Sequence, residues 1–423
     1  MHRHQRLHQA RQRLAHPAAS VGAGPRRISA DRGGHDAALK AAAAFAANPA
    51  LAAGHHPYRA PAWLPGAHLQ TIWPAMVTPR RPLAYRRERW ETPDGDFIDV
   101  DFAPGNDGSA STAPSLAVPI ATASATAAPR PTTGATPLLV LFHGLEGSSH
   151  SHYALALARA AQQRGWRAAI PHFRGCSGEI NRAPRAYHSG DSAEADWILR
   201  RFAREHGHGA PVCAVGVSLG GNVLLKWLGE QGHGADFIAA AAAVSAPQDL
   251  QAGALALSRG FNRVYMRHFL ATLRGKSLAK LAQHPGLFER EPLLRARDFF
   301  GFDDAVTAPM HGFASCYDYW ERSSCRRFLA GIRRPALVIN ALNDPFLPAK
   351  ALASRDEVSD SVTLDYPRHG GHVGFLSGRP PGQLDWLPGR IIDWLQRALV
   401  EQGARAADGL RASAANNGAA VHG

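Results

Sequence analysis

Short apolar runs alternate with amphipathic stretches from residue 138 to residue 400. Continuous apolar runs are typical of strands that are buried on both faces of a sheet. Strands are expected at 138–142, 166–170, 212–217, 237–244, 336–339 and 362–364. The stretches between them have helical periodicity, and helices are expected at 153–164, 193–205, 219–228 and 384–400. This alternation predicts an α/β fold with a mostly parallel, doubly wound sheet.

Two more strand-like segments precede this region. Residues 89–91 and 97–102 flank Asp94-Gly95, a dipeptide typical of a tight hairpin turn. They are expected to add antiparallel strands at the N-terminal edge of the sheet. Between the sixth and seventh strands the alternation stops, and the sequence becomes helix-rich, aromatic and basic. A helical cap over 248–334 is predicted there, placed to cover a pocket at the carboxyl ends of the strands.

Low-complexity segments limit the domain to residues 56–402. Residues 1–55 hold eight basic and two acidic side chains, and therefore nearly half of the formal net charge of +13. They have few large apolar residues and are expected to be a disordered, solvated tail. The Ala/Thr/Pro/Ser-rich segment 104–136 is expected to be an enlarged loop between two strands, and 403–423 a second disordered tail.

Charge and cysteine content exclude several classes of protein. The basic charge suggests nucleic acid, but no binding motif or aromatic platform accompanies it, so nucleic acid is not an expected partner. Four cysteines without C-x-x-C spacing favour reduced thiols and no structural zinc. A secretory signal and an 18-residue apolar run are both missing from the sequence. A cytoplasmic protein is therefore expected.

The pentapeptide Gly216-Val-Ser-Leu-Gly220 lies between an expected strand and an expected helix. A strand that runs into G-x-S-x-G and then into a helix is the setting of a nucleophile elbow, in which a serine hydroxyl is exposed on a strained turn. The glycines are expected because a side chain at either position would strike the neighbouring strand or helix. Alone, the pentapeptide also fits an ordinary glycine-rich loop, but its setting favours Ser218 as a nucleophile.

A serine nucleophile at neutral pH needs an adjacent base and a carboxylate that orients the base. In proteins with this elbow, the acid and then the histidine follow the serine along the chain. Asp344 follows the expected strand 336–339, and His372 follows the expected strand 362–364. Both should lie at the carboxyl ends of strands, so a Ser218–Asp344–His372 triad is predicted.

Other residues compete for these roles. His369 is an alternative base, but the glycines on both sides of His372 favour His372. Asp365 is expected in a turn or in solvent, and Asp318 is expected to be a structural or exposed residue of the cap.

The loop His143-Gly-Leu-Glu-Gly147 follows the third expected strand. An H-G-x-x-G loop at this place would supply N–H donors to the oxyanion of a tetrahedral intermediate. The backbone N–H groups of Leu145 and Leu219 are the predicted donors, the second aided by the positive end of its helix. His143 is expected to brace the loop, and Glu146 to be solvated or paired. No metal and no cofactor are predicted.

With these residues, the chain resembles the YheT-like α/β hydrolases over about residues 57–400. The resemblance rests on seven ordered motifs. They are Pro61-Ala-Trp-Leu-Pro-Gly-Ala-His-Leu-Gln-Thr71, His143-Gly-Leu-Glu-Gly147, His172-Phe-Arg-Gly-Cys-Ser-Gly178, Tyr187-His-Ser-Gly-Asp191, Gly216-Val-Ser-Leu-Gly-Gly-Asn222, Phe302-Asp-Asp-Ala-Val-Thr-Ala-Pro309 and Gly370-Gly-His-Val-Gly-Phe375. Several long motifs in order are far more specific than the elbow alone.

The resemblance implies an α/β-hydrolase fold, the same triad, and hydrolysis of carboxylic esters with short- to medium-chain or lipid-like acyl groups. Arg174, in the motif at residues 172–178, would brace its loop or bind an anionic group, and the glycines beside it favour bracing. His68 and His188 are expected to hold structure. Asp191 is expected to cap the helix that follows it.

The reaction and the role of the cap have alternatives. Acyl transfer to an alcohol would use the same triad, and product analysis with and without ethanol would separate it from hydrolysis. In the cap, Tyr265, Met266, Phe269, Leu270 and Leu273 share a helix face. A helix packed on the core is favoured; the alternative is a lid over an acyl pocket that makes peripheral contact with anionic lipid surfaces.

Overall fold

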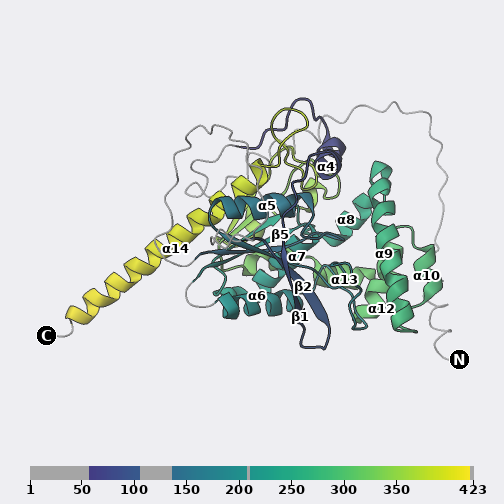
Figure 1. Ribbon diagram of the computed structural model, residues 1–423, viewed down its shortest axis with the longest axis horizontal. Helices are drawn as coiled ribbons and strands as arrows, with labels where there is room; N and C mark the ends of the chain where they lie inside the picture. The colour runs from purple at the N-terminus through teal and green to yellow at the C-terminus, as the bar shows by residue number, and fades with distance from the viewer. Residues whose placement is uncertain (1–56, 105–135, 207–209, 420–423) are drawn as a thin grey trace, which may run out of the picture. The chain divides into compact units, whose positions relative to one another are not determined.

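An eight-stranded sheet lies at the centre of the computed structural model, which describes residues 57–104, 136–206 and 210–419 (Figure 1). The strand order is β1-β2-β4-β3-β5-β6-β7-β8. β1 pairs antiparallel with β2 and β2 with β4, whereas the neighbours from β4 to β8 run parallel. The strands are β1 (Arg86–Glu91), β2 (Phe97–Phe102), β3 (Leu138–Phe142), β4 (Arg167–Pro171), β5 (Val212–Val217), β6 (Ala240–Val244), β7 (Ala336–Ile339) and β8 (Val362–Asp365). The predicted fold class is confirmed.

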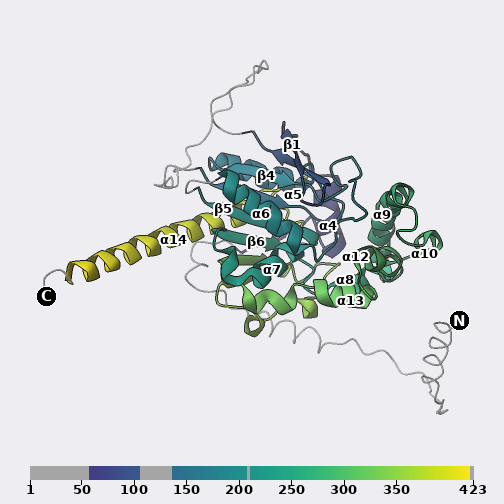
Figure 2. The same ribbon diagram turned by 90° about the horizontal axis from the view of Figure 1, so that it is seen from below.

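Helices cover both faces of this sheet. Figures 1 and 2 show α5 and α14 on one face, with α6 and α7 on the other. The helices outside the cap are α4 (Ala67–Met76), α5 (His152–Gln163), α6 (Ser192–His206), α7 (Leu219–Gln231) and α14 (Trp386–Ala419). Short helical turns are η1 (Gly232–Ala235), η4 (Arg326–Gly331), η5 (Ala349–Ala351) and η6 (Arg355–Glu357).

The apolar character of the central strands follows from this two-sided cover. Along β5, Val212 and Ala214 belong to the core beneath α6 and α7, whereas Cys213 and Val215 belong to the core beneath α5 and α14. Because successive side chains point to opposite faces, a strand between two helical layers needs apolar residues at every position. The continuous apolar runs of the sequence are therefore the signature of this layered sheet.

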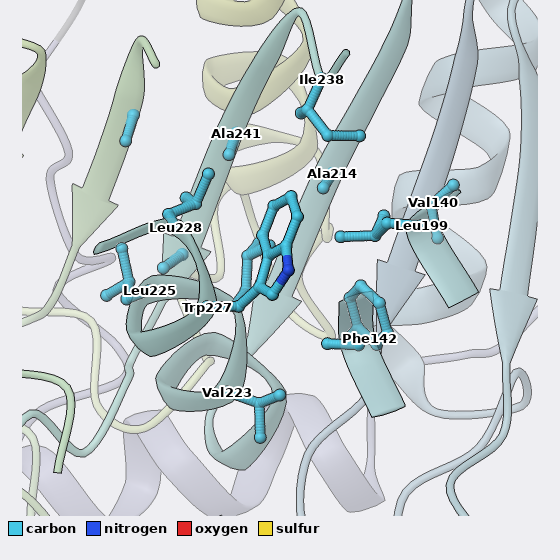
Figure 3. Packing of buried hydrophobic residues seen from close by; sticks show 14 of the residues in the cluster. Val140, Phe142, Leu199, Ala214, Val223, Leu225, Trp227, Leu228, Ile238 and Ala241 are labelled. Atoms are coloured by element: carbon cyan, nitrogen blue, oxygen red, sulfur yellow. The ribbon is translucent and has the colours of Figure 1, made fainter. Parts of the chain in front are cut away.

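Trp227 of α7 shows how large and small residues combine in one of these cores. Its side chain is fully buried, and in Figure 3 the ring lies against Ala214, with Phe142 and Leu199 nearby. Its indole N–H donates to the Asp196 carboxylate at 3.0 Å, so the polar edge of the ring is satisfied. The alanine on the strand leaves the space that the ring fills.

The cap lies between β6 and β7, as predicted. Its α-helices gather beside one end of the strands in both views (Figures 1 and 2). They are α8 (Leu250–Leu257), α9 (Arg263–Gln283), α10 (Arg290–Arg295), α11 (Phe299–Phe302), α12 (Ala308–His311) and α13 (Cys316–Ser323), with the short turns η2 (Gly260–Asn262) and η3 (Asp303–Thr307). Apolar side chains of these helices form two further clusters beside the two cores of the sheet, and one of them also includes Phe346 and Leu347 from the loop after β7.

Some predicted boundaries are wrong. β6 begins at Ala240 and not at residue 237, because the Ile238 N–H bonds the Ala235 carbonyl in a turn. α14 continues to Ala419, beyond the predicted end at residue 400 and through most of the predicted 403–423 tail. Its last part lacks the apolar period but is rich in alanine, which has high helix propensity. The helix α4 was not predicted because Pro74 interrupts its pattern.

The predicted tail 1–55 and nearly all of the 104–136 segment fall outside the described residues. Among the helices of the described residues, none combines the length and the apolar character that crossing a bilayer requires.

Candidate active site

Ser218 lies on the sharp turn between β5 and α7. Its φ is 53°, a left-handed conformation that a non-glycine residue rarely adopts. The Ser218 N–H donates to the Val244 carbonyl at 2.8 Å, and the Asn222 N–H donates to the Ser218 carbonyl at 3.1 Å. The turn is therefore held on both sides, by the neighbouring strand and by the first turn of the helix. This is the strained elbow that the G-x-S-x-G pentapeptide predicts.

Both glycines of the elbow are required by close backbone contacts. A Cβ added to Gly216 would lie 2.4 Å from the Gly220 carbonyl oxygen, and a Cβ added to Gly220 would lie 2.5 Å from that of Phe142. Real side chains do not approach backbone atoms so closely. The predicted steric role of these glycines is confirmed.

Replacing Gly220 by alanine is expected to destabilise the protein by ~1–3 kcal/mol, because the added methyl group must push α7 away from β3. It should also lower activity, since the same shift moves Ser218. Urea unfolding and ester hydrolysis would measure the two effects. The matched control is Gly275→Ala in α9, where an added Cβ meets nothing within 4 Å. That change should leave stability equal or raise it by ~1 kcal/mol or less; equal losses in both variants would contradict the steric argument.

The predicted acid and base meet Ser218 in a continuous line of hydrogen bonds. His372 Nε2 lies 3.0 Å from Ser218 Oγ, and His372 Nδ1 lies 2.8 Å from Asp344 Oδ2. The other carboxylate oxygen of Asp344 accepts the Phe346 N–H at 2.8 Å. The Asp344 side chain is fully buried. Asp344 thus accepts the Nδ1 proton of the ring, which leaves Nε2 free to accept the serine proton.

Residues from α4 position the loop that carries His372. The His372 N–H donates to the Thr71 hydroxyl at 2.9 Å, and the Gly370 N–H donates to Gln70 Oε1 at 3.0 Å. The same Gln70 oxygen accepts the Asn343 side-chain amide at 2.9 Å. One buried glutamine therefore connects the loop of the acid to the loop of the histidine. Sequence reasoning missed both residues, although a Gln-Thr pair inside the first motif was a signal.

Two further contacts, one at His372 and one at the residue that follows it, were also missed. The ring of Phe346 packs against the imidazole, with ring centroids 4.3 Å apart. The Val373 N–H donates to the Ser245 hydroxyl at 3.1 Å. These contacts fix the plane of the imidazole and the backbone that follows it. Neither contact could be predicted from the helical or strand periodicity of the sequence.

The H-G-L-E-G loop passes directly beside the nucleophile. A Cβ on Gly144 would lie 3.2 Å from Ser218 Cβ. The Gly144 N–H donates to the Tyr153 hydroxyl at 2.8 Å, and the Glu146 N–H donates to the Tyr187 hydroxyl at 2.9 Å. Within the described chain, the N–H groups of Leu145 and Leu219 donate to no protein acceptor. These two predicted donors remain available for an oxyanion.

His143 is fully buried and braces two loops, as predicted. Its Nδ1 lies 2.8 Å from the Gly144 carbonyl, and its Nε2 accepts the Phe173 N–H at 3.1 Å. Burial lowers the pKa of His143 to about 3, so the ring is neutral at working pH. With both ring nitrogens used by the backbone, this histidine has no free atom for proton transfer.

Arg174 binds three carboxylates and is almost completely buried. It lies 2.8 Å from both Asp94 and Asp96, and it also pairs with Glu194. The predicted bracing role is confirmed, because the guanidinium joins the β1–β2 hairpin to α6. Its charge is already paired with these carboxylates and not with a ligand.

The other residues that the motifs singled out lie around the site. The Tyr265 hydroxyl contacts the His68 ring at 3.2 Å, and the rings of His188 and His311 are tilted by 50° with their centroids 4.5 Å apart. The Asp191 carboxylate directly before α6 pairs with Arg185. His369 is exposed, Asp365 pairs with Arg390 at 2.8 Å, and Asp318 pairs with Arg322 in α13. None of these competing groups lies on the line from Asp344 to Ser218.

Ser218 and His372 open into an apolar cavity of ≈ 140 Å³. The cap forms much of its wall, through Leu257, Phe269, Leu273, Phe299 and Phe302. On α9, Met266 and Leu270 are buried in the cap while Phe269 and Leu273 face the cavity, so the helix both packs and lines the site.

Comparisons with known proteins agree with this architecture. The sequence profile of the α/β hydrolase fold family matches residues 137–378. YheT of Escherichia coli strain K12, whose name gives esterase as an expected activity, is 40% identical over 337 residues, which are 78% of this chain and 91% of YheT. Mouse phospholipase ABHD3 is 28% identical over 343 residues, which are 79% of this chain and 76% of its own.

A solved esterase of Pyrococcus furiosus covers 76% of this chain and 98% of its own, with 14% identity and a TM-score of 0.46. The family profile spans more than half of the chain, and the match to YheT spans most of both chains. The chain belongs to the α/β hydrolase fold family.

Proposed function

We propose that this protein is a serine hydrolase that cleaves carboxylic esters through an acyl-enzyme intermediate. The observation that carries the proposal is the line of hydrogen bonds from Asp344 through His372 to Ser218, which ends in an apolar cavity. Each group has the partner that its role requires. The names of two relatives, an expected esterase and a phospholipase, support the same chemistry.

Acylation begins when Ser218 Oγ attacks the ester carbonyl and His372 Nε2 takes the hydroxyl proton. The carbonyl π bond opens to an oxyanion, which accepts hydrogen bonds from the N–H groups of Leu145 and Leu219. The intermediate collapses, the C–O bond to the alcohol breaks, and His372 returns its proton to the leaving oxygen. Asp344 stabilises the imidazolium throughout, because its carboxylate stays bonded to Nδ1.

Deacylation repeats these steps with water as the nucleophile. His372 takes a proton from water, the hydroxyl adds to the acyl carbon, and the same two N–H groups bind the oxyanion. The carboxylic acid leaves as the proton returns to Ser218 Oγ.

The cavity favours an apolar acyl group. Its cap wall is made of leucine and phenylalanine side chains, and burying each CH₂ group there contributes ~0.8 kcal/mol. We therefore propose short- to medium-chain or lipid-like acyl esters as the substrate class.

A fluorophosphonate probe tests the proposal directly. The probe should label the wild-type protein on Ser218, and peptide mapping after proteolysis would locate the label. Ser189→Ala is the matched control, because Ser189 lines the same cavity, and its labelling should remain. A series of p-nitrophenyl esters from acetate to palmitate should then give its highest kcat/KM at a short or medium chain. A label on another residue would overturn the mechanism.

A further inference from the structure

The cap touches the H-G-L-E-G loop at one charged contact. Lys276 of α9 places its ammonium 2.9 Å from Glu146 Oε1, across 130 positions of sequence. Glu146 directly follows Leu145, whose N–H is one of the two donors left free beside Ser218. The contact therefore connects a helix of the cap to the peptide next to the site of the proposed oxyanion.

Glu146 is held on two sides by a second residue, Tyr187. The Tyr187 hydroxyl donates to Glu146 Oε1 at 2.7 Å and accepts the Glu146 N–H at 2.9 Å. Burial raises the pKa of Tyr187 well above its ordinary value of 10, so the hydroxyl keeps its proton at working pH. The ring stacks on Phe173 with centroids 5.3 Å apart and an interplanar angle of 7°. Tyr187 thus fixes both the backbone and the carboxylate of Glu146 to the hydrolase core.

The backbone at Glu146 needs this support. Its φ is 55°, a left-handed conformation that is strained for a residue with a side chain and persists only where surrounding contacts impose it. If the Glu146 carboxylate were released, the backbone could relax towards an ordinary conformation. The Leu145–Glu146 peptide would then rotate about the Leu145 Cα. That rotation would displace the preceding Gly144–Leu145 peptide, which carries the Leu145 N–H.

The surroundings of the ion pair make it stronger than a surface contact. The Glu146 side chain is only 11% exposed and that of Lys276 33% exposed. The Lys276 ammonium also lies 3.5 Å from Cys176 Sγ, in the loop that carries Arg174. In such partly desolvated places, removing one member leaves the other charge without its partner.

The same helix also touches the acyl cavity. Leu273, one turn before Lys276, lines the cavity together with Leu145. A displacement of α9 therefore moves an acyl-binding side chain and the partner of Glu146 together. Lys276 itself lines a second cavity, which shares Tyr187 and Leu273 with the first.

We propose that Lys276 is a positioning residue that, through Glu146 and Tyr187, holds the Leu145 N–H in the geometry that stabilises the oxyanion. This rests on the proposed ester hydrolysis. It assigns the cap a part in transition-state stabilisation in addition to forming the wall of the acyl cavity.

Steady-state hydrolysis of a p-nitrophenyl ester by full-length variants tests the proposal. Lys276→Met should lower kcat by about tenfold to a hundredfold, because a displaced N–H stabilises the transition state less, while KM stays nearly constant. Lys276→Arg keeps a cation within reach of Glu146 and should recover most of kcat. Arg267→Met is the matched control, since it removes an exposed cation from the same helix and should leave kcat unchanged.

A double-mutant cycle tests whether Lys276 acts through Glu146. Glu146→Gln removes the charge but keeps an oxygen that can accept the Tyr187 proton. If the proposal is right, the Lys276→Met/Glu146→Gln double variant loses no more kcat than the worse single variant. The proposal would be overturned if the double variant lost kcat by the product of the two single losses. It would also be overturned if Lys276→Met kept its kcat and only raised KM or lowered the unfolding temperature.

Ser218→Ala measured in parallel separates the two proposals. If Ser218→Ala keeps its activity, the proposed function fails. If Ser218→Ala is inactive and Lys276→Met retains full kcat, only the positioning role fails.

Discussion

Replacing Ser218 by alanine is expected to lower kcat for a p-nitrophenyl ester by about 10⁴- to 10⁶-fold. The acyl-enzyme cannot form without Oγ, and His372 is left with no proton to take from the nucleophile. Only substrate binding and the free N–H groups of Leu145 and Leu219 remain to accelerate attack by water. The loss should therefore appear in kcat, with little change in KM.

The fold should survive this substitution. Alanine keeps the Cβ that already occupies the left-handed turn, so no new steric contact arises. Circular dichroism and the thermal unfolding midpoint should match the wild type, and the fluorophosphonate label should disappear. An unchanged hydrolysis rate in a folded Ser218→Ala variant would refute the assignment of the nucleophile.

Replacing Asp344 by asparagine should lower kcat by about 10⁴-fold. Asp344 accepts the Nδ1 proton of His372 with one oxygen and the Phe346 N–H with the other. An amide has only one oxygen, so one of these two donors must face an NH₂ group. If the NH₂ group faces the ring, it favours the tautomer with the proton on Nε2, which cannot accept the serine proton. The carboxylate charge that stabilises the imidazolium is lost as well.

The matched control is Asp365→Asn, at the end of the neighbouring strand β8. Its carboxylate binds Arg390 at 2.8 Å. Activity should stay close to that of the wild type in this variant, whereas stability falls slightly. The pH profile of kcat for both variants would check the prediction; a full rate for Asp344→Asn would remove this residue from the mechanism.

Local patterns predict most of the sheet and the line of the triad. β5 and β6 are continuous apolar runs because helices cover both faces of the sheet. Their composition alone therefore indicates that they are buried. The elbow can also be predicted locally. A side chain at Gly216 or Gly220 would clash with the backbone of the turn or of the adjacent strand. Asp344 and His372 could be found because each follows its own strand, and parallel strands bring their carboxyl ends to one edge.

Long-range polar contacts could not be predicted in this way. Gln70 and Thr71 hold the His372 loop across about 300 positions of sequence, and Lys276 reaches Glu146 across 130. Neither contact is encoded in a helical or strand period, because a period reports which face of an element is apolar and not which distant loop meets its polar side chains.

The sequence by itself determined the layered sheet and the elbow, and it predicted that Ser218, Asp344 and His372 meet at one edge of the sheet. These features follow from burial, from turn sterics and from the common direction of parallel strands. Only the tertiary structure decided which residues hold the site in place. The Gln70 bridge, the Phe346 contact with the imidazole and the Lys276–Glu146 pair depend on how α4, the Asp344 loop and the cap pack around the sheet. Packing between distant segments depends on the whole chain, so it cannot be predicted from the sequence of any one segment.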